Sequence, residues 1–384
     1  MVLSYRIFYL DAFCSSAAAC SFLIGRGFQS KVALLRWTVR LSYYPSMDPA
    51  PFVPSFTTCT TRADVALAVE VLSRHPYVVL DTEGKSIGTI DGELSLLCLG
   101  TPVAGHAQQI FVMDMVALRT VPAALRTLKT FLERPNIVKI VFDGRMDSVE
   151  LFHDLGVSLT KVLDLQVAEV LARQHILRES ERQRHERLAH GGFGFRLVRI
   201  NKTAMEGLHV VSGMQKLLEE LRMDKIVQKD AEVVAMHRTN GSGLWMERPL
   251  SEKLLQYAAN DIFIIAHLFD TFRRIKYVPS TRHALSRLIT KCDQYVSRSG
   301  HVGLRTLQNG VFRPKGLLMA AALEPAEGTT FECAGCGLHL TIQCYQVQIT
   351  KGRGSRKMHC RICNAIVIKS KTEITPEPSW VALP

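Results

Sequence analysis

The sequence predicts an α/β protein, in which a mixed β-sheet is flanked by helices, with a small cysteine-containing module near the C-terminus. Strand-like runs at 77–84, 94–101 and 110–115 follow one another closely, as sequential strands of a sheet do. Later strand-like runs, at 137–144 and from 162, are separated by helical segments, as in parallel βαβ units. Two CxxC pairs at 333–363 lie outside this alternation and indicate a separate module.

Composition narrows the classes of partner. The chain has 384 residues and a formal net charge of +12, which favours a polyanionic partner, either nucleic acid or an anionic membrane surface, although solubility alone could explain it. No apolar run reaches the roughly 18 residues expected of a spanning helix, so no membrane insertion is expected. The ten cysteines are scattered apart from the CxxC pairs, which favours metal thiolates in a reducing compartment over a secreted disulfide framework.

The first 55 residues differ from the rest of the chain. They carry five basic residues before position 47 and a single acid, Asp11. Disorder or a gene-model extension upstream of Met47 is the first interpretation of residues 1–46, and a mitochondrial targeting segment is the second. We therefore expect an intracellular protein, nuclear or cytoplasmic, with mitochondrial import as the alternative.

A first domain is expected over 56–278. "TTRADVALAVEVLSRH" from Thr60 predicts a capped helix before the first strand. "VPAALRTLKTFLERP" predicts a helix that stops at a proline, and "MDSVELFHDLG" predicts a short helix closed by Gly156. The pattern "VLDLQVAEVLARQ" resumes a strand-to-helix order, and Ser251 is placed to cap a long helix over 252–275.

Residues 173–206 interrupt this domain as a basic insertion. It has many arginines and little apolar periodicity, which favours a solvated surface excursion, and contact with phosphates is the alternative. A basic helical segment and a linker are expected over 279–330, and the cysteine module over 331–370.

Carboxylates stand at the ends of the predicted strands and on the long helix. Asp81 and Glu83 in "YVVLDTEG" share one face of an extended chain. Asp147 falls near the start of the helix that follows the strand at 137–144. Tyr257 and Asp261 are four residues apart and share a helix face, where the apolar run after Asp261 implies that a cation accompanies it.

In this order, these motifs resemble the DEDD superfamily of 3′–5′ exonucleases, and within it the tyrosine-bearing (DEDDy) branch typified by RNase D. "GMQKLLEELRMDK" and "WMERPLSEKLLQYAANDI" have that family's order and character, and the resemblance covers about 58–275. It implies an RNase H-like fold and a metal-dependent 3′–5′ exonuclease acting on single-stranded RNA or DNA.

The resemblance also implies the roles of the residues. Asp81 would bridge two Mg²⁺ or Mn²⁺ ions, Glu83 and Asp261 would complete the site that activates water, and Asp147 would support the second ion. Tyr257 would orient the attacking water rather than act as a strong base, because an ordinary tyrosine has a pKa near 10. Carboxylate oxygens are the ligands that Mg²⁺ prefers.

Asp143 competes with Asp147 for the second motif. The family's acid follows its strand by several residues and starts a helix, which favours Asp147. Asp143 is then expected to cap the strand–helix turn or to pair with Arg145.

Cys333, Cys336, Cys360 and Cys363 have the spacing of a zinc ribbon. The strand-like "LHLTIQCYQVQI" lies between the two knuckles, and four thiolates would close a tetrahedral structural Zn²⁺ site. A redox pair or a chance pattern is the alternative, and Cys344 and His359 are expected to be bystanders. "KGRGSRK" is a basic loop that could contact nucleic acid.

Two other function classes remain open from the sequence. One is a catalytically silent RNA-binding scaffold with an exonuclease fold, against which the complete set of acids argues. The other is a zinc-ribbon protein of transcription or translation, in which 58–275 serve only for docking.

Overall fold

The computed structural model describes residues 53–297, except 90, 106, 226 and 228, together with 316–370 and 379–383. The expected N-terminal segment lies almost wholly outside the described residues, as do residues 298–315 of the expected linker. Residues 51–384 form one compact unit. No helix among the described residues is long and apolar enough to cross a membrane.

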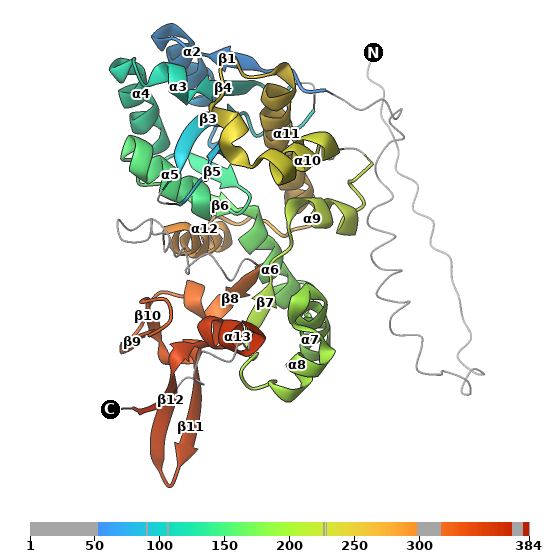
Figure 1. Ribbon diagram of the computed structural model, residues 1–384, viewed down its shortest axis with the longest axis vertical. Coiled ribbons are helices and arrows are strands. Elements are labelled where there is room, and N and C mark those ends of the chain that lie inside the picture. The colour runs from blue at the N-terminus through green and yellow to red at the C-terminus, as the bar shows by residue number, and fades with distance from the viewer. Residues whose placement is uncertain are drawn as a thin grey trace, which may run out of the picture. The chain divides into compact units, whose positions relative to one another are not determined.

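A six-stranded sheet forms the centre of the fold, in the order β1–β4–β3–β2–β5–β6 (Figure 1). Its strands are β1 (Thr57–Cys59), β2 (Tyr77–Lys85), β3 (Glu93–Gly100), β4 (Ile110–Asp114), β5 (Val138–Val141) and β6 (Val162–Asp164). β3 runs antiparallel to β2 and β4, and the other pairs are parallel. The predicted α/β architecture with a mixed sheet is confirmed; the short edge strand β1 was not predicted.

The strand β2 lies inside the sheet, between β3 and β5. Its apolar residues Val78, Val79 and Leu80 are fully buried, so β2 is fixed on both faces up to Asp81. Directly after Glu83 the pairing register with β3 shifts, and a Cβ built at Gly84 would lie 2.1 Å from the backbone oxygen of Glu93. Only glycine permits this approach, so Gly84 sets the irregular end of the strand.

Helices cover the sheet, and their ends follow the sequence signals. They are α2 (Arg62–Leu72), α3 (Met115–Leu118), α4 (Pro122–Leu132), α5 (Arg145–Leu155), α6 (Leu165–His175), α9 (Met214–Glu220), α10 (Ala231–Asn240), η2 (Ser242–Met246), α11 (Glu252–Arg274) and α12 (Arg282–Ser297). Thr61 caps α2 in a capping box with Asp64, Gly156 ends α5 with positive φ, and Ser251 Oγ accepts the Leu254 N–H. α11 packs against β2, β3 and β4, and α12 against β6 and α5, so both belong to the main core.

The arginine-rich insertion and the C-terminal module share a second hydrophobic core. From the insertion come α7 (Glu181–Leu188), the π-helical turn η1 (Ala189–Phe193) and α8 (Phe195–Ile200), and β7 (Leu208–Val210) follows directly after it. From the C-terminal region come β8 (Leu317–Met319) and η3 (Ala320–Leu323), inside the segment expected to be a linker. β7 pairs with β8, and Leu188 and Phe193 belong to one buried cluster with Cys333 and Cys360.

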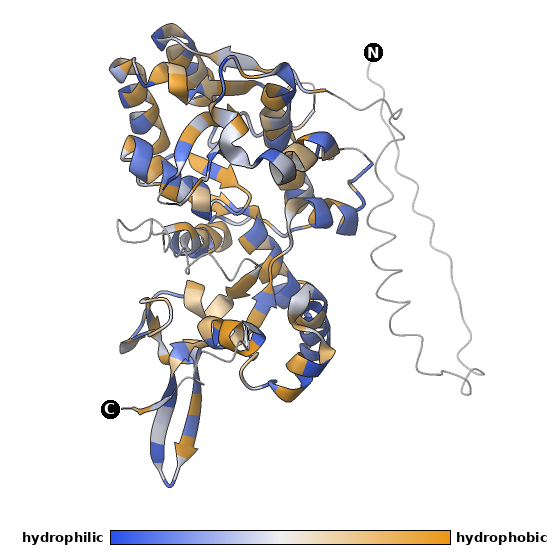
Figure 2. Ribbon diagram, viewed as in Figure 1, coloured by the Kyte–Doolittle hydropathy of each residue, from blue (hydrophilic) through white to orange (hydrophobic). Residues whose placement is uncertain are grey.

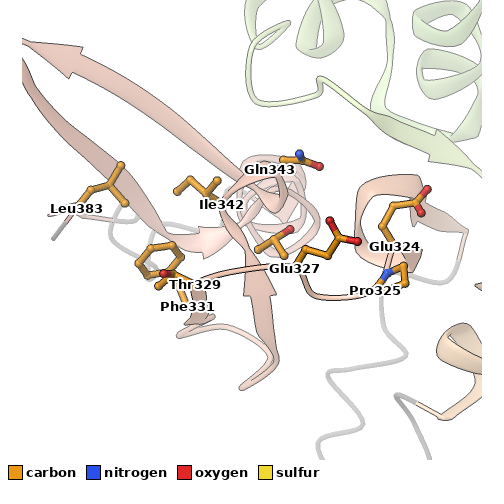
Figure 3. A pocket seen from close by; sticks show the side chains of 9 residues that line it. Glu324, Pro325, Glu327, Thr329, Phe331, Ile342, Gln343 and Leu383 are labelled. Carbon is orange, nitrogen blue, oxygen red and sulfur yellow. The ribbon is translucent and has the colours of Figure 1, made fainter.

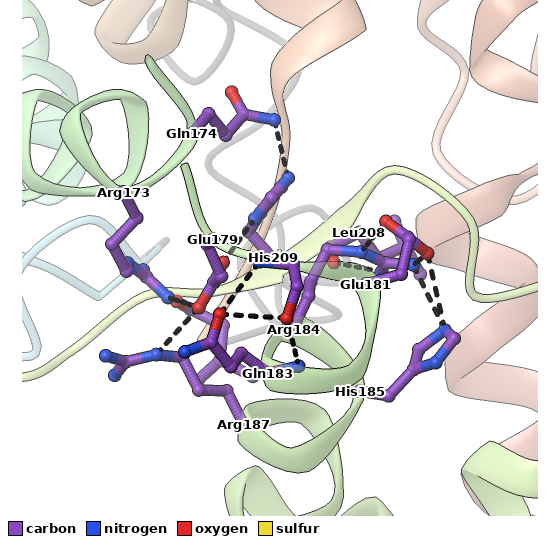
Figure 4. Close-up of polar contacts among 12 residues, drawn as sticks. Arg173, Gln174, Glu179, Glu181, Gln183, Arg184, His185, Arg187, Leu208 and His209 are labelled. Atoms are coloured by element: carbon purple, nitrogen blue, oxygen red, sulfur yellow. Dashed lines mark hydrogen bonds and ion pairs between the residues drawn. The ribbon is translucent and has the colours of Figure 1, made fainter. Parts of the chain in front are cut away.

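The expectation of a solvated excursion at 173–206 is therefore incomplete, because more than half of its residues are exposed but several others are buried in this second core. α7 is largely hydrophilic in Figure 2, and some of its polar side chains are buried and make internal contacts. Arg184 is 3% exposed and donates to the backbone oxygens of Met205 and Leu208, both at 2.7 Å (Figure 4). Arg173, 1% exposed, pairs with Glu169 at 2.8 Å. These arginines hold backbone carbonyls and acids that periodicity alone does not reveal.

The cysteine module contains two small sheets and a helix. Its elements are β9 (Thr330–Glu332), β10 (His339–Thr341), η4 (Ile342–Cys344), β11 (Tyr345–Thr350), β12 (Arg353–Cys360), α13 (Arg361–Ser370) and β13 (Trp380–Ala382). β9 pairs with β10, and β11, β12 and β13 form an antiparallel sheet. The single strand expected over 338–349 is thus broken by η4, where the buried Cys344 turns the chain from one sheet to the next.

Candidate active site

Three of the predicted acids come together at the junction of β2 and α11. Carboxylate oxygens of Asp81, Glu83 and Asp261 lie within 4.8 Å of one another. Asp81 and Glu83 project from one face of β2, and α11 lies across that face. Tyr257 is one helical turn before Asp261, and both side chains are largely buried. The structure therefore joins two motifs that are about 180 residues apart in the chain.

Asp147 lies beside this group, in the first turn of α5. Its Oδ1 accepts hydrogen bonds from the backbone N–H of Thr82 at 3.0 Å and from Thr82 Oγ1 at 2.7 Å. Thr82 is the residue between Asp81 and Glu83, so the bond places Asp147 at the same end of β2. Asp147 is not among the three acids whose oxygens cluster most closely.

Asp143 has a different set of contacts. It has a positive φ of 57°, and its carboxylate accepts two hydrogen bonds from Arg145, at 2.6 and 2.8 Å. Arg145 in turn stacks on the ring of Tyr295 in α12, 4.8 Å from its centroid. Asp143 thus makes the expected pair with Arg145, while the cap at this turn is Asp164, which accepts from the N–H groups of Asp143 and Gly144.

The acids raise one another's pKa. Burial raises the pKa of Asp81 well above its usual value, and the neighbouring Asp147, Asp261 and Glu83 add to the rise. Burial, and then Asp261, raise the pKa of Glu83 in the same direction. The pKa of Asp147 rises to about 6 through burial, against the hydrogen bonds from Thr82 that lower it. Such a concentration of buried carboxylates is stable in charged form only with cations beside it.

One cation is supplied by Lys229, which sequence reasoning missed. Its Nζ lies 2.6 Å from Asp261 Oδ2 and 3.2 Å from the hydroxyl of Tyr257. The sequence indicated only that Asp261 needs a positive partner. Lys229 stands in the stretch "DKIVQKD" before α10, where no periodicity or motif marks it. Burial raises the pKa of Tyr257, and Asp261 raises it further, so its hydroxyl stays protonated.

A pocket of about 790 Å³ opens over the acids. Asp81, Asp261 and Lys229 line it on one side. Its remaining walls come from the turn after β5, α6, the start of α9, and α10, through Phe142, Asp143, Gln166, Gly213, Met214, Gln215, Lys216, Ala231 and Ala235. The volume is that of a small-molecule site, with acids and a lysine at one end.

The donor set fits hard divalent cations. Mg²⁺ binds oxygen at 2.0–2.1 Å in octahedral geometry, so its ligand oxygens lie about 3–4 Å apart. The spacing of Asp81, Glu83 and Asp261 within 4.8 Å agrees with this. These three residues could hold one ion, and Asp147 could support a second.

The four predicted cysteines also come together. The sulfurs of Cys333, Cys336, Cys360 and Cys363 lie within 4.8 Å of one another, as a tetrahedral Zn–S₄ site with bonds of about 2.3 Å requires. Cys333 Sγ accepts the N–H groups of Gly335 at 3.4 Å and of Cys360 at 3.1 Å, contacts that favour a thiolate. Cys344 and His359 are not members of this cluster.

A second pocket, of about 530 Å³, lies in the cysteine module (Figure 3). Phe331, Ile342 and Leu383 give it apolar walls, and Glu324 and Glu327 lie at one side. Glu324 accepts a hydrogen bond from Lys291 at 2.5 Å, so one of these two acids is already paired. Asp81, Asp261 and Lys229 line the pocket of about 790 Å³, so that pocket is the candidate catalytic site.

Comparison with known proteins agrees with this geometry. A family model described as 3′–5′ exonuclease matches residues 56–275. The crystal structure of Trypanosoma brucei RNase D aligns at 22% identity and a TM-score of 0.50, over 75% of this chain and 86% of that one. The same enzyme in complex with RNA U12 aligns at 23% identity and a TM-score of 0.48, over 80% of this chain and 87% of that one. Escherichia coli RNase D, described as an exoribonuclease involved in structured RNA processing, aligns at 17% identity and a TM-score of 0.38. The alignment covers 65% of this chain and 51% of that one. A search of curated proteins gave no match.

Proposed function

The chain belongs to the family of 3′–5′ exonuclease domains, and from this premise we propose that it removes nucleotides from the 3′ end of single-stranded nucleic acid with the help of two divalent metal ions. The family match makes the chain a nuclease that hydrolyses phosphodiester bonds. The observation that carries the finer proposal is the cluster of Asp81, Glu83 and Asp261, two of which, Asp81 and Asp261, line a pocket of about 790 Å³.

Each acid has a role that its position supports. Bound Mg²⁺ or Mn²⁺ would lower the pKa of a water and stabilise charge on the leaving 3′ oxygen. Asp81 lies in the field of all three other acids, so it is the candidate for the shared ligand. Glu83 and Asp261 would complete the first ion's site, and Asp147 would hold the second ion directly or through water.

Tyr257 would position the attacking water through its hydroxyl. Because burial and Asp261 raise its pKa, Tyr257 keeps its proton and acts as a donor and acceptor rather than as a base. The proton of the water would then leave with solvent or be taken by a carboxylate.

The pocket and the charge of the chain support an unpaired strand end as substrate. A pocket of about 790 Å³ is of the size that encloses small ligands, which suits the last nucleotides of a single strand better than a duplex. The net charge of +12 favours a polyanion. The cysteine cluster would hold one structural Zn²⁺.

The test is digestion of 5′-labelled single-stranded RNA and DNA with added Mg²⁺, resolved at single-nucleotide steps. We expect a ladder that shortens from the 3′ end and stops when Mg²⁺ is withheld. Cleavage that begins inside the strand, or that is unchanged without a divalent ion, would refute the proposal. Binding without any cleavage in Mg²⁺ or Mn²⁺ would favour the silent scaffold instead.

A further inference from the structure

Lys229 occupies a position that the exonuclease reaction does not by itself require. It lies between α9 and α10 and reaches across to α11, where its ammonium is 2.6 Å from Asp261 Oδ2 and 3.2 Å from the Tyr257 hydroxyl. The Asp261 side chain is 4% exposed and that of Lys229 is 25% exposed. The contact is thus a short ion pair, largely removed from water, on one of the three clustered acids.

This ion pair and a metal ion make opposing demands on the same carboxylate. A dication bound to Asp261 would lie about 2 Å from a carboxylate oxygen. An ammonium bonded to the same carboxylate would then face a double positive charge within a few ångströms, at low effective dielectric constant. The repulsion is lowest when the ammonium moves away, and a lysine can do so because its charge stands on a flexible four-carbon stem.

The pocket offers a place for the displaced ammonium. Lys229 is itself one of the residues that line it. If the proposed function holds, that pocket receives a phosphodiester, whose negative charge an ammonium would offset.

We propose that Lys229 is the internal counter-ion of the active site: it holds Asp261 while no metal is bound, competes with the metal for that carboxylate, and on release pairs with the phosphate of the substrate. Only the last step, the pairing of Lys229 with the phosphate of the substrate, rests on the proposed function. It makes Lys229 a residue that links metal binding to substrate binding.

The experiment compares wild type with Lys229→Met and Lys229→Arg. Calorimetric titration with Mg²⁺ at pH 8, on protein that keeps its zinc, measures metal affinity without any turnover. Lys229→Met removes the competing charge and should tighten Mg²⁺ binding by about tenfold, about 1.4 kcal/mol. At saturating Mg²⁺ the same variant should raise KM for a short single strand by about tenfold, while Lys229→Arg, which keeps a competing positive charge, should bind Mg²⁺ less tightly than Lys229→Met.

A matched control is Lys253→Met. Lys253, on α11, forms an ion pair with Glu232 on α10 and so also joins this segment to α11, but it lies outside the acid cluster. It should leave Mg²⁺ affinity and KM within about twofold. Mg²⁺ affinity that is unchanged or weaker in Lys229→Met, or an unchanged KM, would overturn the inference. If wild type itself neither binds Mg²⁺ nor cleaves, the proposed function fails. That outcome differs from the failure of the Lys229 inference, in which wild type binds Mg²⁺ and cleaves but Lys229→Met behaves like it.

Discussion

Asp147 accepts two hydrogen bonds from Thr82 through the single oxygen Oδ1, one from the backbone N–H at 3.0 Å and one from Oγ1 at 2.7 Å. The bond ties the first turn of α5 to the residue between Asp81 and Glu83. Burial raises the pKa of the Asp147 carboxylate to about 6, against the hydrogen bonds from Thr82. An asparagine at 147 could keep both bonds with its amide oxygen, so charge and geometry can be separated at this position.

Asp147→Asn should lower turnover by about 100-fold or more and leave the fold intact. The variant removes a negative charge beside the leaving group. A fall in turnover of about 100-fold corresponds to about 3 kcal/mol of lost transition-state stabilisation. The measurement is single-turnover cleavage of a short single strand at saturating Mg²⁺, with melting curves alongside.

Asp143→Asn serves as its control. Asparagine tolerates the positive φ of this residue, but the variant leaves the buried Arg145 without its carboxylate. Stability should fall by roughly 1–3 kcal/mol, while turnover changes by less than about tenfold. If Asp143→Asn has no cleavage activity and Asp147→Asn keeps it, Asp143 and not Asp147 is the acid of the second motif.

Asp81→Asn should abolish cleavage and raise the melting temperature of the metal-free protein. Asp81 is placed in the field of three other acids, so neutralising it relieves repulsion among them. A rise of a few degrees without added Mg²⁺ is expected, and Mg²⁺ should stabilise the variant less than it stabilises wild type. Wild-type turnover in Asp81→Asn would contradict the site assignment.

Tyr257→Phe should reduce turnover by roughly 10²-fold with little change in Mg²⁺ affinity. The ring would still pack near Trp245, whose ring centroid is 6.3 Å away, but the hydroxyl that positions water would be lost. Because the pKa of Tyr257 is raised, the pH–rate profile should lack a tyrosine ionisation in both proteins. A variant with normal turnover would show that the hydroxyl only partners Lys229.

Stabilisation by Mg²⁺ should weaken as pH falls below about 6. The folded pKa of Asp147 is raised from 3.8 to about 6, so the metal-free fold binds this proton more tightly than the unfolded chain. Its contribution to stability is therefore greatest at low pH and is lost as pH rises from about 4 to about 6. Mg²⁺ must displace the proton, so its effect has the opposite pH dependence.

The measurement is the Mg²⁺-induced shift in melting temperature at pH 5.5 and at pH 8, with zinc left in place. The shift should be clearly larger at pH 8. Asp147→Asn, which cannot titrate, should show less of this difference than wild type. Equal shifts at both pH values in wild type would count against metal binding by these carboxylates.

Local sequence patterns were sufficient to predict the helices and strands that are specified by residues close together in the chain. The buried run before Asp81, the spacing of Tyr257 and Asp261, and the capping residue Ser251 are all local, and the strand and helices that they predict are present. The CxxC spacing predicted a four-cysteine cluster for the same reason.

What the sequence could not predict depends on contacts between distant segments. Lys229 reaches Asp261 from a stretch without periodicity, so only the need for a cation was visible. The burial of part of the insertion was missed because Arg184, which donates to the carbonyls of Met205 and Leu208, cannot be told by sequence from the exposed arginines around it. The pairing of β7 with β8 joins residues more than 100 positions apart, and no local pattern announces it.

Loss of zinc should loosen the arginine-rich insertion as well as the cysteine module. Cys333 and Cys360 share a buried cluster with Leu188 and Phe193, so the metal supports a core to which the insertion contributes. Cys336→Ser should lose most of its zinc, about one equivalent in wild type, and trypsin should then cut rapidly at Arg182, Arg196 or Arg199. Wild type should resist there, because α7 and α8 are packed.

Cys344→Ala is the matched control for this prediction. Cys344 is fully buried in the same core but is not one of the four clustered cysteines. The variant should keep its zinc and remain resistant at these sites, although the small cavity lowers its stability. If Cys336→Ser loses zinc while the insertion stays resistant, the insertion is held by its own polar network around Arg173 and Arg184, and the metal supports the cysteine module alone. If the insertion is cut while the main sheet stays resistant, the two cores unfold separately.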